Sequence, residues 1–329
     1  MKILITGGTG FIGSRLALNS INKGHEVIVF GQTNTKAEET NIDILKKAGV
    51  NIIYGAVTDK KIIEQAVSGC DYVFHLAAAQ HEANVPDKHF YDVNVDGTQN
   101  IIEASIAAGV KRFLHGSTIG IYGSAMDGDI DETTSPSPNN IYGVTKLKGE
   151  QLALSYADKI PLTVIRISET YGPGDRRLLK LFKAIKKGVF FMIGDGKNIH
   201  QLIHVDDLID GMYQAIESDA AIGEVFVLAG QERLTTNDMV KIVANSVDSP
   251  IRKFRSPLWP FLLAAIILEK TLQPLGIQPP LHRRRLDFFR KSFYFVQDKS
   301  EKILTFKPKK NFAQGAEETA KWYTDQNLI

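Results

Sequence analysis

The chain begins Met1-Lys2-Ile3-Leu4-Ile5-Thr6-Gly7-Gly8-Thr9-Gly10-Phe11-Ile12-Gly13, and this stretch decides the fold. Its apolar run, residues 3–5, is too short for a helix and ends at glycines, so it predicts a buried parallel strand. The spacing Gly8-x-Gly10-x-x-Gly13 leads into a helical pattern over residues 12–21. A strand, a glycine turn and a helix in this order bind a dinucleotide, because its pyrophosphate can approach free N–H groups at the positive end of the helix. The stretch therefore predicts a nicotinamide dinucleotide site.

The composition is that of an ordinary globular enzyme. The chain has 329 residues, of which 43% are apolar and 23% charged, so one major domain with an appended lobe is expected. A net charge of +2 gives no reason to expect nucleic acid as a partner. The single cysteine, Cys70, excludes an intrachain disulfide and favours a reducing, cytoplasmic location. The N-terminal apolar run is already used as a strand, so no signal peptide is expected.

A second buried strand is predicted over residues 25–30 from the apolar run 27–30, and the residues after it should select the cofactor. An acid there would bond the adenosine ribose and favour NAD, whereas a cation would favour the 2′-phosphate of NADP. The chain continues instead with Gly31, Gln32, Thr33, Asn34, Thr35 and Lys36. The first acid is Glu38. The stretch therefore favours NADP, with NAD as the alternative.

Further apolar runs predict the rest of a parallel sheet. They cover residues 51–54, 71–76 and 111–115, and 224–228 adds a late strand. The small residues 77–79 would let a cofactor cross the end of the fourth strand, where ligands bind in open α/β sheets. The predicted fold class is a Rossmann-type doubly wound α/β sheet with a smaller C-terminal substrate-binding lobe. The sheet domain would comprise residues 1–166 and about 205–230, and the lobe about 167–204 and 231–329.

Tyr142 and Lys146 are four residues apart at the start of a predicted helix, so they share one helix face. A free phenol has a pKa of about 10 and is a poor base at neutral pH. A neighbouring ammonium group and the positive nicotinamide ring would stabilise the phenolate. The hydroxyl of Thr118 could hold the substrate oxygen while Tyr142 exchanges its proton.

These segments together resemble the extended short-chain dehydrogenase/reductase family, in its NAD-dependent epimerase/dehydratase group. The resemblance covers essentially the whole chain. The motifs that carry it are Thr6–Gly13, Leu76-Ala77-Ala78, Ser117-Thr118, Tyr142-Gly143-Val144-Thr145-Lys146, Arg166, Tyr171-Gly172-Pro173-Gly174-Asp175, Ile193-Gly194-Asp195-Gly196 and Ile203-His204-Val205-Asp206-Asp207-Leu208.

The resemblance implies that Thr118, Tyr142 and Lys146 form the catalytic set, with Lys146 also bonding the nicotinamide ribose. Asn94 matches a position that supports the active-site helix. Together with the motifs above, the predicted cofactor-binding residues are Gly7, Gly8, Thr9, Gly10, Phe11, Ile12, Gly13, Gly31, Gln32, Thr33, Lys36, Ala56, Val57, Leu76, Ala77, Ala78, Asn94, Ser117, Tyr142 and Lys146. No metal site is expected.

Departures from the family pattern narrow the reaction. Relatives that dehydrate sugars carry an Asp-Glu pair after the catalytic threonine, but Ile119 and Gly120 stand here and neither can move a proton. Relatives that epimerise at carbons 3 and 5 use a cysteine, and Cys70 lies in the wrong place. Simple carbonyl/alcohol redox or 4-epimerisation remains.

The predicted substrate-binding residues are Ala79, Glu169, Thr170, His200 and Arg284. Glu169 replaces an asparagine that contacts the diphosphate in nucleotide-sugar relatives, and a carboxylate would repel phosphate. His200 stands where those relatives carry arginine. The run Arg283-Arg284-Arg285 resembles the segment that closes over the diphosphate, and it is equally compatible with a solvated basic turn.

Residues 258–268 contain no polar side chain but are too few to span a bilayer, which takes about 20 residues. A buried or dimer-packed helix is the main expectation. Interfacial attachment to anionic lipid and a lid over a lipid-like substrate are the alternatives, so peripheral membrane contact remains open.

The resulting hypothesis is an NAD(P)-dependent enzyme that transfers a hydride at a secondary alcohol or ketone of a small molecule. Nucleotide-sugar 4-epimerisation is the leading reaction. The alternatives are a 3β-hydroxysteroid dehydrogenase-like or 3-oxoacyl reductase activity, and a non-catalytic dinucleotide-binding module. A homodimer is expected.

Overall fold

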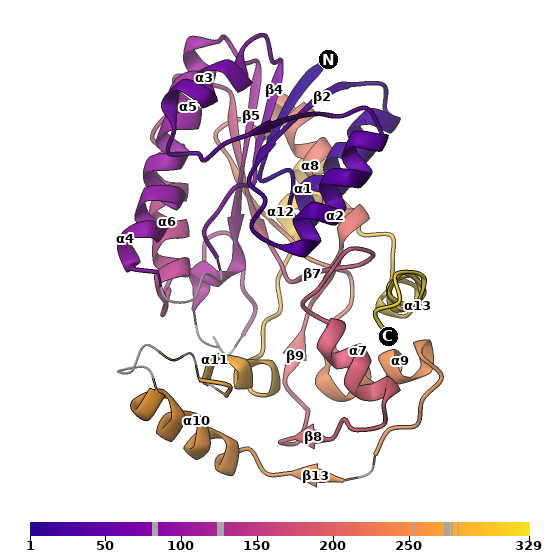
Figure 1. The fold of residues 1–329 in the computed structure, drawn as a ribbon. Coiled ribbons are helices and arrows are strands. Elements are labelled where there is room, and N and C mark those ends of the chain that lie inside the picture. The colour runs from indigo at the N-terminus through magenta and orange to yellow at the C-terminus, as the bar shows by residue number, and fades with distance from the viewer. Residues whose placement is uncertain (81–84, 124–127, 253, 273–276, 278, 282) are drawn as a thin grey trace.

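A computed structural model describes residues 1–80, 85–123, 128–252, 254–272, 277, 279–281 and 283–329. Its centre is a seven-stranded sheet in the order β11-β6-β5-β4-β1-β2-β3, in which every pairing is parallel (Figure 1). The strands are β1 (Lys2–Thr6), β2 (Glu26–Gly31), β3 (Asn51–Tyr54), β4 (Tyr72–His75), β5 (Arg112–Thr118), β6 (Leu162–Ile167) and β11 (Val225–Leu228). The predicted doubly wound fold is confirmed.

Helices cover both faces of the sheet, which explains why its strands are apolar on both sides. One face packs against α1 (Phe11–Asn22), α2 (Lys36–Lys47) and α8 (Val205–Glu217). The other face packs against α3 (Lys60–Val67), α5 (Gly97–Ala107) and α6 (Ile141–Leu154). Figure 1 shows these two layers on either side of the strands.

The order of the strands reverses beside β1. In the pairing register Ile3 faces Val27 of β2 on one side and Tyr72 of β4 on the other. Because all strands are parallel, their carboxyl ends meet at one edge of the sheet. The crevice outside that edge, at the reversal, is where open α/β sheets bind ligands.

A second core cluster lies below this edge, among α7 (Leu179–Lys186), α9 (Thr236–Ser246) and α13 (Phe312–Asp325). Short strands pair beside it: β7 (Thr170–Tyr171) with β10 (Ile203–His204), β9 (Ile199–His200) with β12 (Leu234–Thr235), and β8 (Met192–Ile193) with β13 (Arg255–Ser256). The chain then returns to the sheet through α12 (Asp298–Leu304). Leu304 and Phe306 lie in the same hydrophobic cluster as the buried residues of α1 and α8. The remaining elements are α4 (Asp87–Tyr91), the π-helix η1 (Asp92–Asp96), η2 (Ile119–Tyr122), η3 (Asp219–Ala221), α10 (Trp259–Leu272), α11 (Arg283–Leu286) and η5 (Asp287–Phe289).

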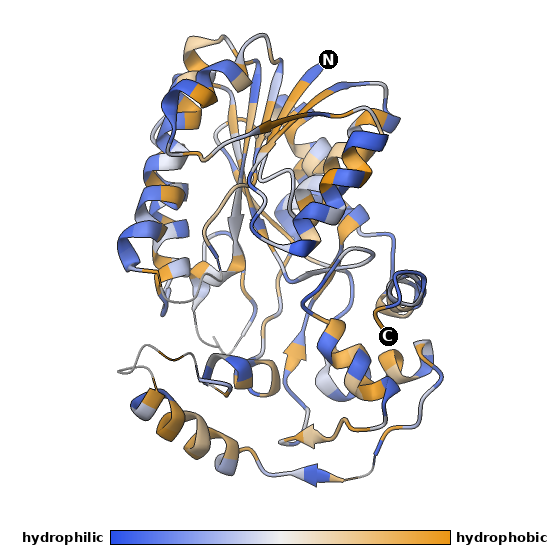
Figure 2. Ribbon diagram, viewed as in Figure 1, coloured by the Kyte–Doolittle hydropathy of each residue, from blue (hydrophilic) through white to orange (hydrophobic). Residues whose placement is uncertain are grey.

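Helix α10 corrects one expectation from the sequence. The apolar stretch 258–268 does form a helix, but Ala265 is its only buried residue among those described. The helix lies at the edge of the molecule and is hydrophobic along most of its length (Figure 2). A buried core helix is therefore wrong for this segment, since four of its large side chains, Trp259, Leu263, Ile266 and Ile267, are exposed.

Helix α6 sits unusually close to η1. A Cβ on Gly149 would lie 2.3 Å from the carbonyl oxygen of Asn94, so only glycine permits this approach. Asn94 also donates from Nδ2 to Thr145 Oγ1 at 2.9 Å, which joins the two elements directly. At the start of α6, a Cβ on Gly143 would lie 2.7 Å from the carbonyl oxygen of Gly120. The helix position is thus set by two glycines and one buried amide.

We predict that Gly149→Ala destabilises the protein. In an open helix this change would stabilise by up to about 1 kcal/mol through helix propensity. Here the new methyl group meets backbone that cannot rotate away, and overpacking of this kind costs about 1–3 kcal/mol. Thermal and urea unfolding should show a lower stability, whereas Gln151→Ala on the exposed side of α6 should change little. A melting temperature above that of the parent would contradict this packing.

Two histidines are completely buried in the sheet, with ring centroids 5.4 Å apart. The nitrogens of His75 lie 2.7 Å from Thr6 Oγ1 and 3.0 Å from Thr98 Oγ1. His115 has no hydrogen-bond partner among the described residues. Burial, with a smaller contribution from the charge of Lys146, lowers the pKa of His75 to about 3. The same two causes, in the same order, hold the pKa of His115 well below its usual range.

Acid should therefore destabilise the fold from about pH 6.5 downward. Below the ordinary pKa of histidine the unfolded chain binds protons that the folded chain excludes, at about 1.4 kcal/mol per pH unit for each histidine. We predict that His115→Leu weakens the fall in melting temperature between pH 7 and pH 5. At pH 8 the imidazole is neutral in both the folded and the unfolded protein. The change in melting temperature measured there is therefore the packing effect of the substitution alone, without the effect of protonation. An unchanged slope would mean that His115 is protonated in the folded protein.

Candidate active site at the carboxyl ends of the strands

The turn after β1 forms a close-fitting cradle. A Cβ on Gly7, whose φ is +66°, would lie 2.7 Å from the backbone nitrogen of Ala77, and one on Gly13 would lie 2.4 Å from the carbonyl oxygen of Gly7. At Gly10 a Cβ would meet only the Gly7 carbonyl oxygen, at a tight 3.3 Å. Backbone thus lines the N-terminus of α1 without side chains in the way. This is the shape that a dinucleotide pyrophosphate requires, so the predicted cradle fits a nicotinamide dinucleotide.

The end of β2 is closed by Thr9. Its hydroxyl donates to the carbonyl oxygen of Gln32 at 2.9 Å, and a Cβ on Gly31 would lie 2.8 Å from the same hydroxyl oxygen. The amide of Asn41 donates to the Thr9 carbonyl oxygen at 2.9 Å. The position at which a ribose-binding acid was sought is therefore too tight for a larger side chain.

Glu38, in the first turn of α2, bonds to the loop that was predicted to select the cofactor. Its carboxylate accepts from the backbone N–H groups of Asn34 at 2.7 Å and Thr35 at 2.8 Å, as part of a capping box at the start of α2. Lys36 is exposed in the first turn of that helix, and Thr33 is exposed in the loop. The loop that the sequence suggested for a 2′-phosphate thus already holds a carboxylate, bonded to the backbone N–H groups of Asn34 and Thr35. The pattern Thr35-x-x-Glu38 was the signal for this cap.

Asn94 holds the exit of β4. Its Oδ1 accepts from the backbone N–H of Ala79 at 2.8 Å, and its Nδ2 donates to the carbonyl oxygen of Ala79 at 3.0 Å. The N–H of Ala77 donates to Thr6 Oγ1 at 3.2 Å. The predicted residues 76–79 therefore run past the cradle on a path fixed at both ends. Across the crevice Val57 is buried and Ala56 is partly exposed.

The predicted catalytic side chains meet at the end of β5. A Cβ on Gly120 would lie 3.3 Å from Thr118 Oγ1 and 3.6 Å from Tyr142 Cε1, so this glycine separates the hydroxyl from the phenol ring. The Gly120 N–H donates to Thr118 Oγ1 at 3.0 Å and fixes the threonine rotamer. Ile119 is buried, pointing into the core rather than into the crevice.

Lys146 is buried on α6, one helical turn after Tyr142. Its Nζ donates to the carbonyl oxygen of Gly116 at 2.7 Å, and the residue is 2% exposed. Burial lowers the pKa of Lys146 to about 8, although Glu150 raises it in part. An ammonium group in this position gives up its proton more readily than an ordinary lysine and has few competing water molecules.

A buried ion pair that the sequence analysis missed supports the same helix. Glu150 of α6 and Arg166 of β6 form a salt bridge at 2.7 Å, with side chains 2% and 7% exposed. Arg166 also donates to Tyr122 Oη at 2.6 Å and to the carbonyl oxygen of Glu132 at 2.9 Å. Ser117 donates to the Glu150 carboxylate at 2.5 Å, so its hydroxyl belongs to this network. The only sequence signal was an acid one helical turn after Lys146.

Glu169 and His200, both predicted to contact substrate, bond to each other. His200 Nδ1 lies 3.3 Å from Glu169 Oε2, and Arg177 donates to Glu169 Oε1 at 3.0 Å. Burial alone would raise the pKa of Glu169, but Arg177 and His200 outweigh it and lower the pKa to about 2. The carboxylate is therefore charge-compensated. Arg177, which follows the Gly174-Asp175 motif by two residues, was not singled out from the sequence.

The remaining predicted substrate residues lie around this cluster. Thr170 is buried in β7, where its hydroxyl donates to the carbonyl oxygen of Ser168 at 3.0 Å. His200 Nε2 lies 3.1 Å from both Thr236 Oγ1 and the carbonyl oxygen of Phe288. Arg284 belongs to α11, but its side chain lies outside the described part of the structure.

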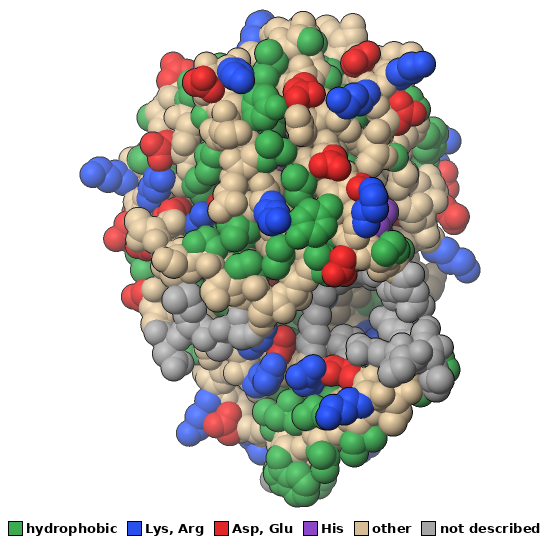
Figure 3. All heavy atoms as spheres, turned by 90° about the vertical axis from the view of Figure 1, so that its left-hand side faces the viewer, with side chains coloured by type: hydrophobic (Ala, Val, Ile, Leu, Met, Phe, Trp, Pro, Cys, Tyr) green, Lys and Arg blue, Asp and Glu red, His purple; other side chains and the backbone are tan. Residues whose placement is uncertain are grey.

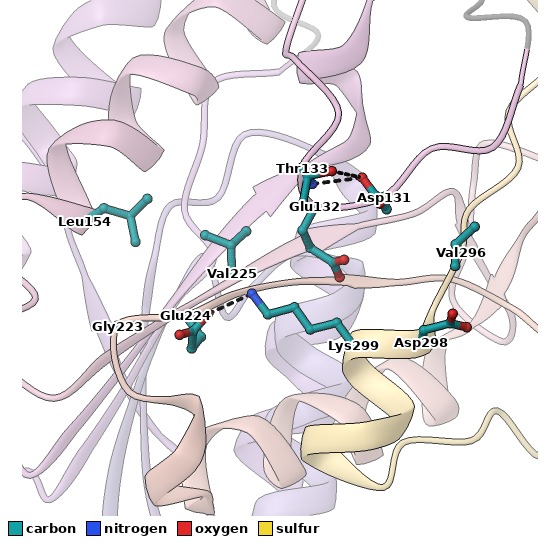
Figure 4. A pocket seen from close by; sticks show the side chains of 10 residues that line it. All are labelled: Asp131, Glu132, Thr133, Leu154, Gly223, Glu224, Val225, Val296, Asp298 and Lys299. Carbon is teal, nitrogen blue, oxygen red and sulfur yellow. Dashed lines mark hydrogen bonds and ion pairs between the residues drawn. The ribbon is translucent and has the colours of Figure 1, made fainter.

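Two other features lie away from the crevice. A pocket of about 500 Å³ opens between α12, β11 and residues 131–133, beside the ion pair of Glu224 and Lys299 (Figure 4). None of the predicted site residues lines it. Within the described residues, one group has the spacing of metal ligands: His204, Asp206 and Glu318. The ammonium of Lys310 already bridges the two carboxylates of that group, at 3.3 and 2.5 Å.

Comparison with known proteins agrees with this geometry. The profile of the NAD dependent epimerase/dehydratase family matches residues 3–229. A dTDP-glucose 4,6-dehydratase of Streptomyces antibioticus is 27% identical over 338 residues, which cover 99% of this chain and 93% of the relative. The N-acetyl-alpha-D-glucosaminyl-diphospho-ditrans,octacis-undecaprenol 4-epimerase of Escherichia coli O157:H7 is 29% identical over 262 residues, 78% of this chain and 75% of the relative.

A solved structure extends the likeness to three dimensions. The UDP-glucuronic acid 4-epimerase of Bacillus cereus, crystallised in complex with NAD, superimposes with a TM-score of 0.79 at 25% identity and covers 99% of both chains. The glycine cradle and the parallel sheet thus agree with the sequence profile. The chain belongs to the NAD-dependent epimerase/dehydratase family and is an enzyme of that family.

Proposed function

We propose that the enzyme inverts carbon 4 of a sugar carried on a diphosphate, by oxidising and re-reducing that carbon. The observation that carries this proposal is Gly120. It separates Thr118 from Tyr142, and its lack of a side chain leaves the crevice without a carboxylic acid at the position where sugar dehydratases carry one. The groups for hydride chemistry are present at this position, whereas the groups for water loss are not.

Three side chains carry out the proton transfer in this reaction. Thr118 holds the hydroxyl of carbon 4 and Tyr142 removes its proton during oxidation and returns it during reduction. The buried Lys146 stabilises the phenolate that this exchange produces. When bound in the cradle, the nicotinamide dinucleotide supplies and accepts the hydride. If the oxidised sugar rotates in the site between the two steps, the hydride returns to the opposite face of carbon 4. The configuration at that carbon is then inverted.

The environment of Glu169 supports a diphosphate in this position. A bare carboxylate would repel phosphate, and this was the sequence argument for an apolar hydroxysteroid or 3-oxoacyl substrate. Arg177 balances the charge of Glu169 and is itself exposed beside it, and His200 Nδ1 lies 3.3 Å from the same carboxylate. An exposed guanidinium can receive a phosphate oxygen.

A polyprenyl diphosphate is a second candidate for the carrier. The Escherichia coli relative is named for such a substrate, and this chain exposes the hydrophobic helix α10 below the crevice. The sugar and the diphosphate would bind in the same way with either carrier, so the chemistry at Tyr142 is unaffected.

Homodimer formation and a cytoplasmic location stay predictions.

We propose NAD rather than NADP as the cofactor, in contrast to the sequence preference. The backbone N–H groups of Asn34 and Thr35, in the loop expected to receive a 2′-phosphate, donate to the Glu38 carboxylate. A second anion in this loop would meet the Glu38 carboxylate. The complex of the Bacillus cereus epimerase with NAD supports the same choice.

The reaction is tested by incubating the purified enzyme and NAD with UDP- and dTDP-hexoses, and with a polyprenyl-diphosphate sugar in detergent, and identifying products by NMR. We expect the C4 epimer of one of them. Tyr142→Phe should lower turnover about 10²–10⁴-fold, the usual contribution of a general acid/base, while cofactor binding is retained. Tyr54→Phe, an exposed tyrosine at the far edge of the sheet, should behave as the parent.

Two results would contradict the proposal. Release of a 4-keto-6-deoxy sugar would identify a dehydratase whose acid lies elsewhere. Turnover of a hydroxysteroid or 3-oxoacyl compound, with none of any diphosphate sugar, would establish the apolar alternative.

Cofactor choice is tested by titrating the apoprotein with NADH and NADPH and following nicotinamide fluorescence. We expect NADH to bind at least about tenfold more tightly, a difference of about 1.4 kcal/mol. Glu38→Gln should narrow this gap by removing the like charge, whereas Glu39→Gln, its neighbour in the same helical turn, should not. Equal or tighter binding of NADPH by the parent protein would support the sequence preference instead.

A further inference from the structure

The exposed face of α10 is an ordered apolar stripe. Trp259, Leu263, Ile266 and Ile267 are 67, 53, 37 and 53% exposed, and they follow one another at intervals of four, three and one. On a helix this spacing places them on one side. In a globular protein such a stripe normally faces the core, and here it faces solvent.

The opposite side of α10 is attached to the molecule. Ala265 is fully buried, and the ring of Phe261 lies 6.2 Å from that of Phe191. At the C-terminal end Glu269 forms an ion pair with Arg283 of α11 at 2.7 Å. The helix therefore presents a defined face outward.

Hydrophobic exposure is concentrated here. Of the eleven exposed large hydrophobic side chains in the described residues, seven lie between residues 251 and 277: Ile251, Phe254, Trp259, Leu263, Ile266, Ile267 and Ile277. Isolated exposed hydrophobic residues are ordinary, but a contiguous group of this kind marks a surface that binds something.

Positive charge is concentrated in the same segment of the sequence. Residues 251–286 contain seven Lys and Arg side chains and one acid, a net charge of +6 in a chain whose total is +2. Arg252, Lys270 and Arg285 are exposed in this segment, and no carboxylate of the described residues forms an ion pair with them. Figure 3 shows hydrophobic side chains at the bottom of this side of the molecule, with Lys and Arg side chains along their upper border.

We propose that α10 binds the surface of an anionic lipid bilayer, with its axis parallel to the membrane and its apolar stripe among the lipid chains. Hydrophobic side chains enter the acyl boundary while the flanking cations meet anionic headgroups. Tryptophan is well suited to the interface, because its ring is apolar and its N–H is polar.

Charge and length argue against the other occupants. A second copy of the chain would bring a second surface of net positive charge against the first, and like charges repel. A helix of 14 residues is about 21 Å long, short of the roughly 30 Å hydrocarbon core. No helix in the described residues is long and apolar enough to cross a bilayer.

This inference goes beyond the proposed reaction, and it holds with either carrier. It concerns where the enzyme works. A bilayer bound at α10 would hold the part of the molecule below the crevice against a membrane, while the sheet and its cofactor cradle remain in the aqueous phase.

Sedimentation with vesicles tests the proposal. The full-length protein is mixed with vesicles of equimolar phosphatidylglycerol and phosphatidylcholine, or of phosphatidylcholine alone. We expect at least tenfold tighter binding to the anionic vesicles, reduced by 0.5 M NaCl. The emission of Trp259 should shift to shorter wavelength on binding, and the shift should be lost in Trp259→Phe, which leaves Trp322 as reporter.

Substitution of the stripe separates this surface from the rest of the molecule. The double variant Leu263→Glu, Ile267→Glu should bind the anionic vesicles at least tenfold more weakly and keep the melting temperature of the parent. Ile44→Glu is the matched control, because Ile44 is 42% exposed on α2 and lies outside the stripe. It should bind as the parent does.

Three results would overturn the proposal: no binding of the parent to anionic vesicles, equal binding to both vesicle types, or a parent dimer that the double variant converts to monomers without any vesicle binding. The last would assign α10 to a second copy of the chain. Activity on a water-soluble diphosphate sugar is measured in parallel. Retained activity in a double variant that no longer binds vesicles keeps the membrane surface and the proposed reaction as separate conclusions.

Discussion

The buried ion pair between Glu150 and Arg166 is the constraint on which the active site depends. It joins α6 to β6 at 2.7 Å, and the remaining hydrogen-bonding groups of Arg166 reach Tyr122 and the Glu132 carbonyl. Removing one partner from such a pair typically costs about 3–5 kcal/mol, because the other charge stays buried without compensation. Since α6 also carries Tyr142 and Lys146, the same interaction that anchors the helix aligns the groups proposed to move the proton.

Missing side chains shape the site as much as those that are present. Gly149 lets α6 approach the Asn94 carbonyl, Gly13 lets α1 approach the glycine turn, and Gly120 keeps a space between Thr118 and Tyr142. A Cβ atom added at Gly149 or Gly13 would collide with backbone, and one added at Gly120 would narrow the space between Thr118 and Tyr142. The crevice is therefore rigid, because the elements around it touch through backbone rather than through flexible side chains.

The central sheet was predictable because its strands are short apolar runs bounded by glycines and polar turns. The late strand near 224–228 was found in this way, and it pairs with β6 as β11. The helix over 258–268 was also found, but not its exposure. Apolar composition shows that a segment can be buried. Whether it is buried depends on whether another element of the fold covers it. Nothing among the described residues covers the stripe of α10.

The sequence by itself determined six of the seven strands, the glycine turn and the residues that resemble a catalytic set, because these depend on local patterns with a known spacing. The strand β6 was not predicted. Tertiary structure decided the environment of each charge. Glu38 is bonded into the loop that seemed free of acid, Glu169 is balanced by Arg177, and Glu150 is paired with Arg166. The Glu38 contact is local, within a capping box, whereas the partners of Glu169 and Glu150 lie 8 and 16 positions away and meet only when the chain folds. A carboxylate's effect on a ligand depends on the cations within a few ångströms of it, and only the folded chain specifies those.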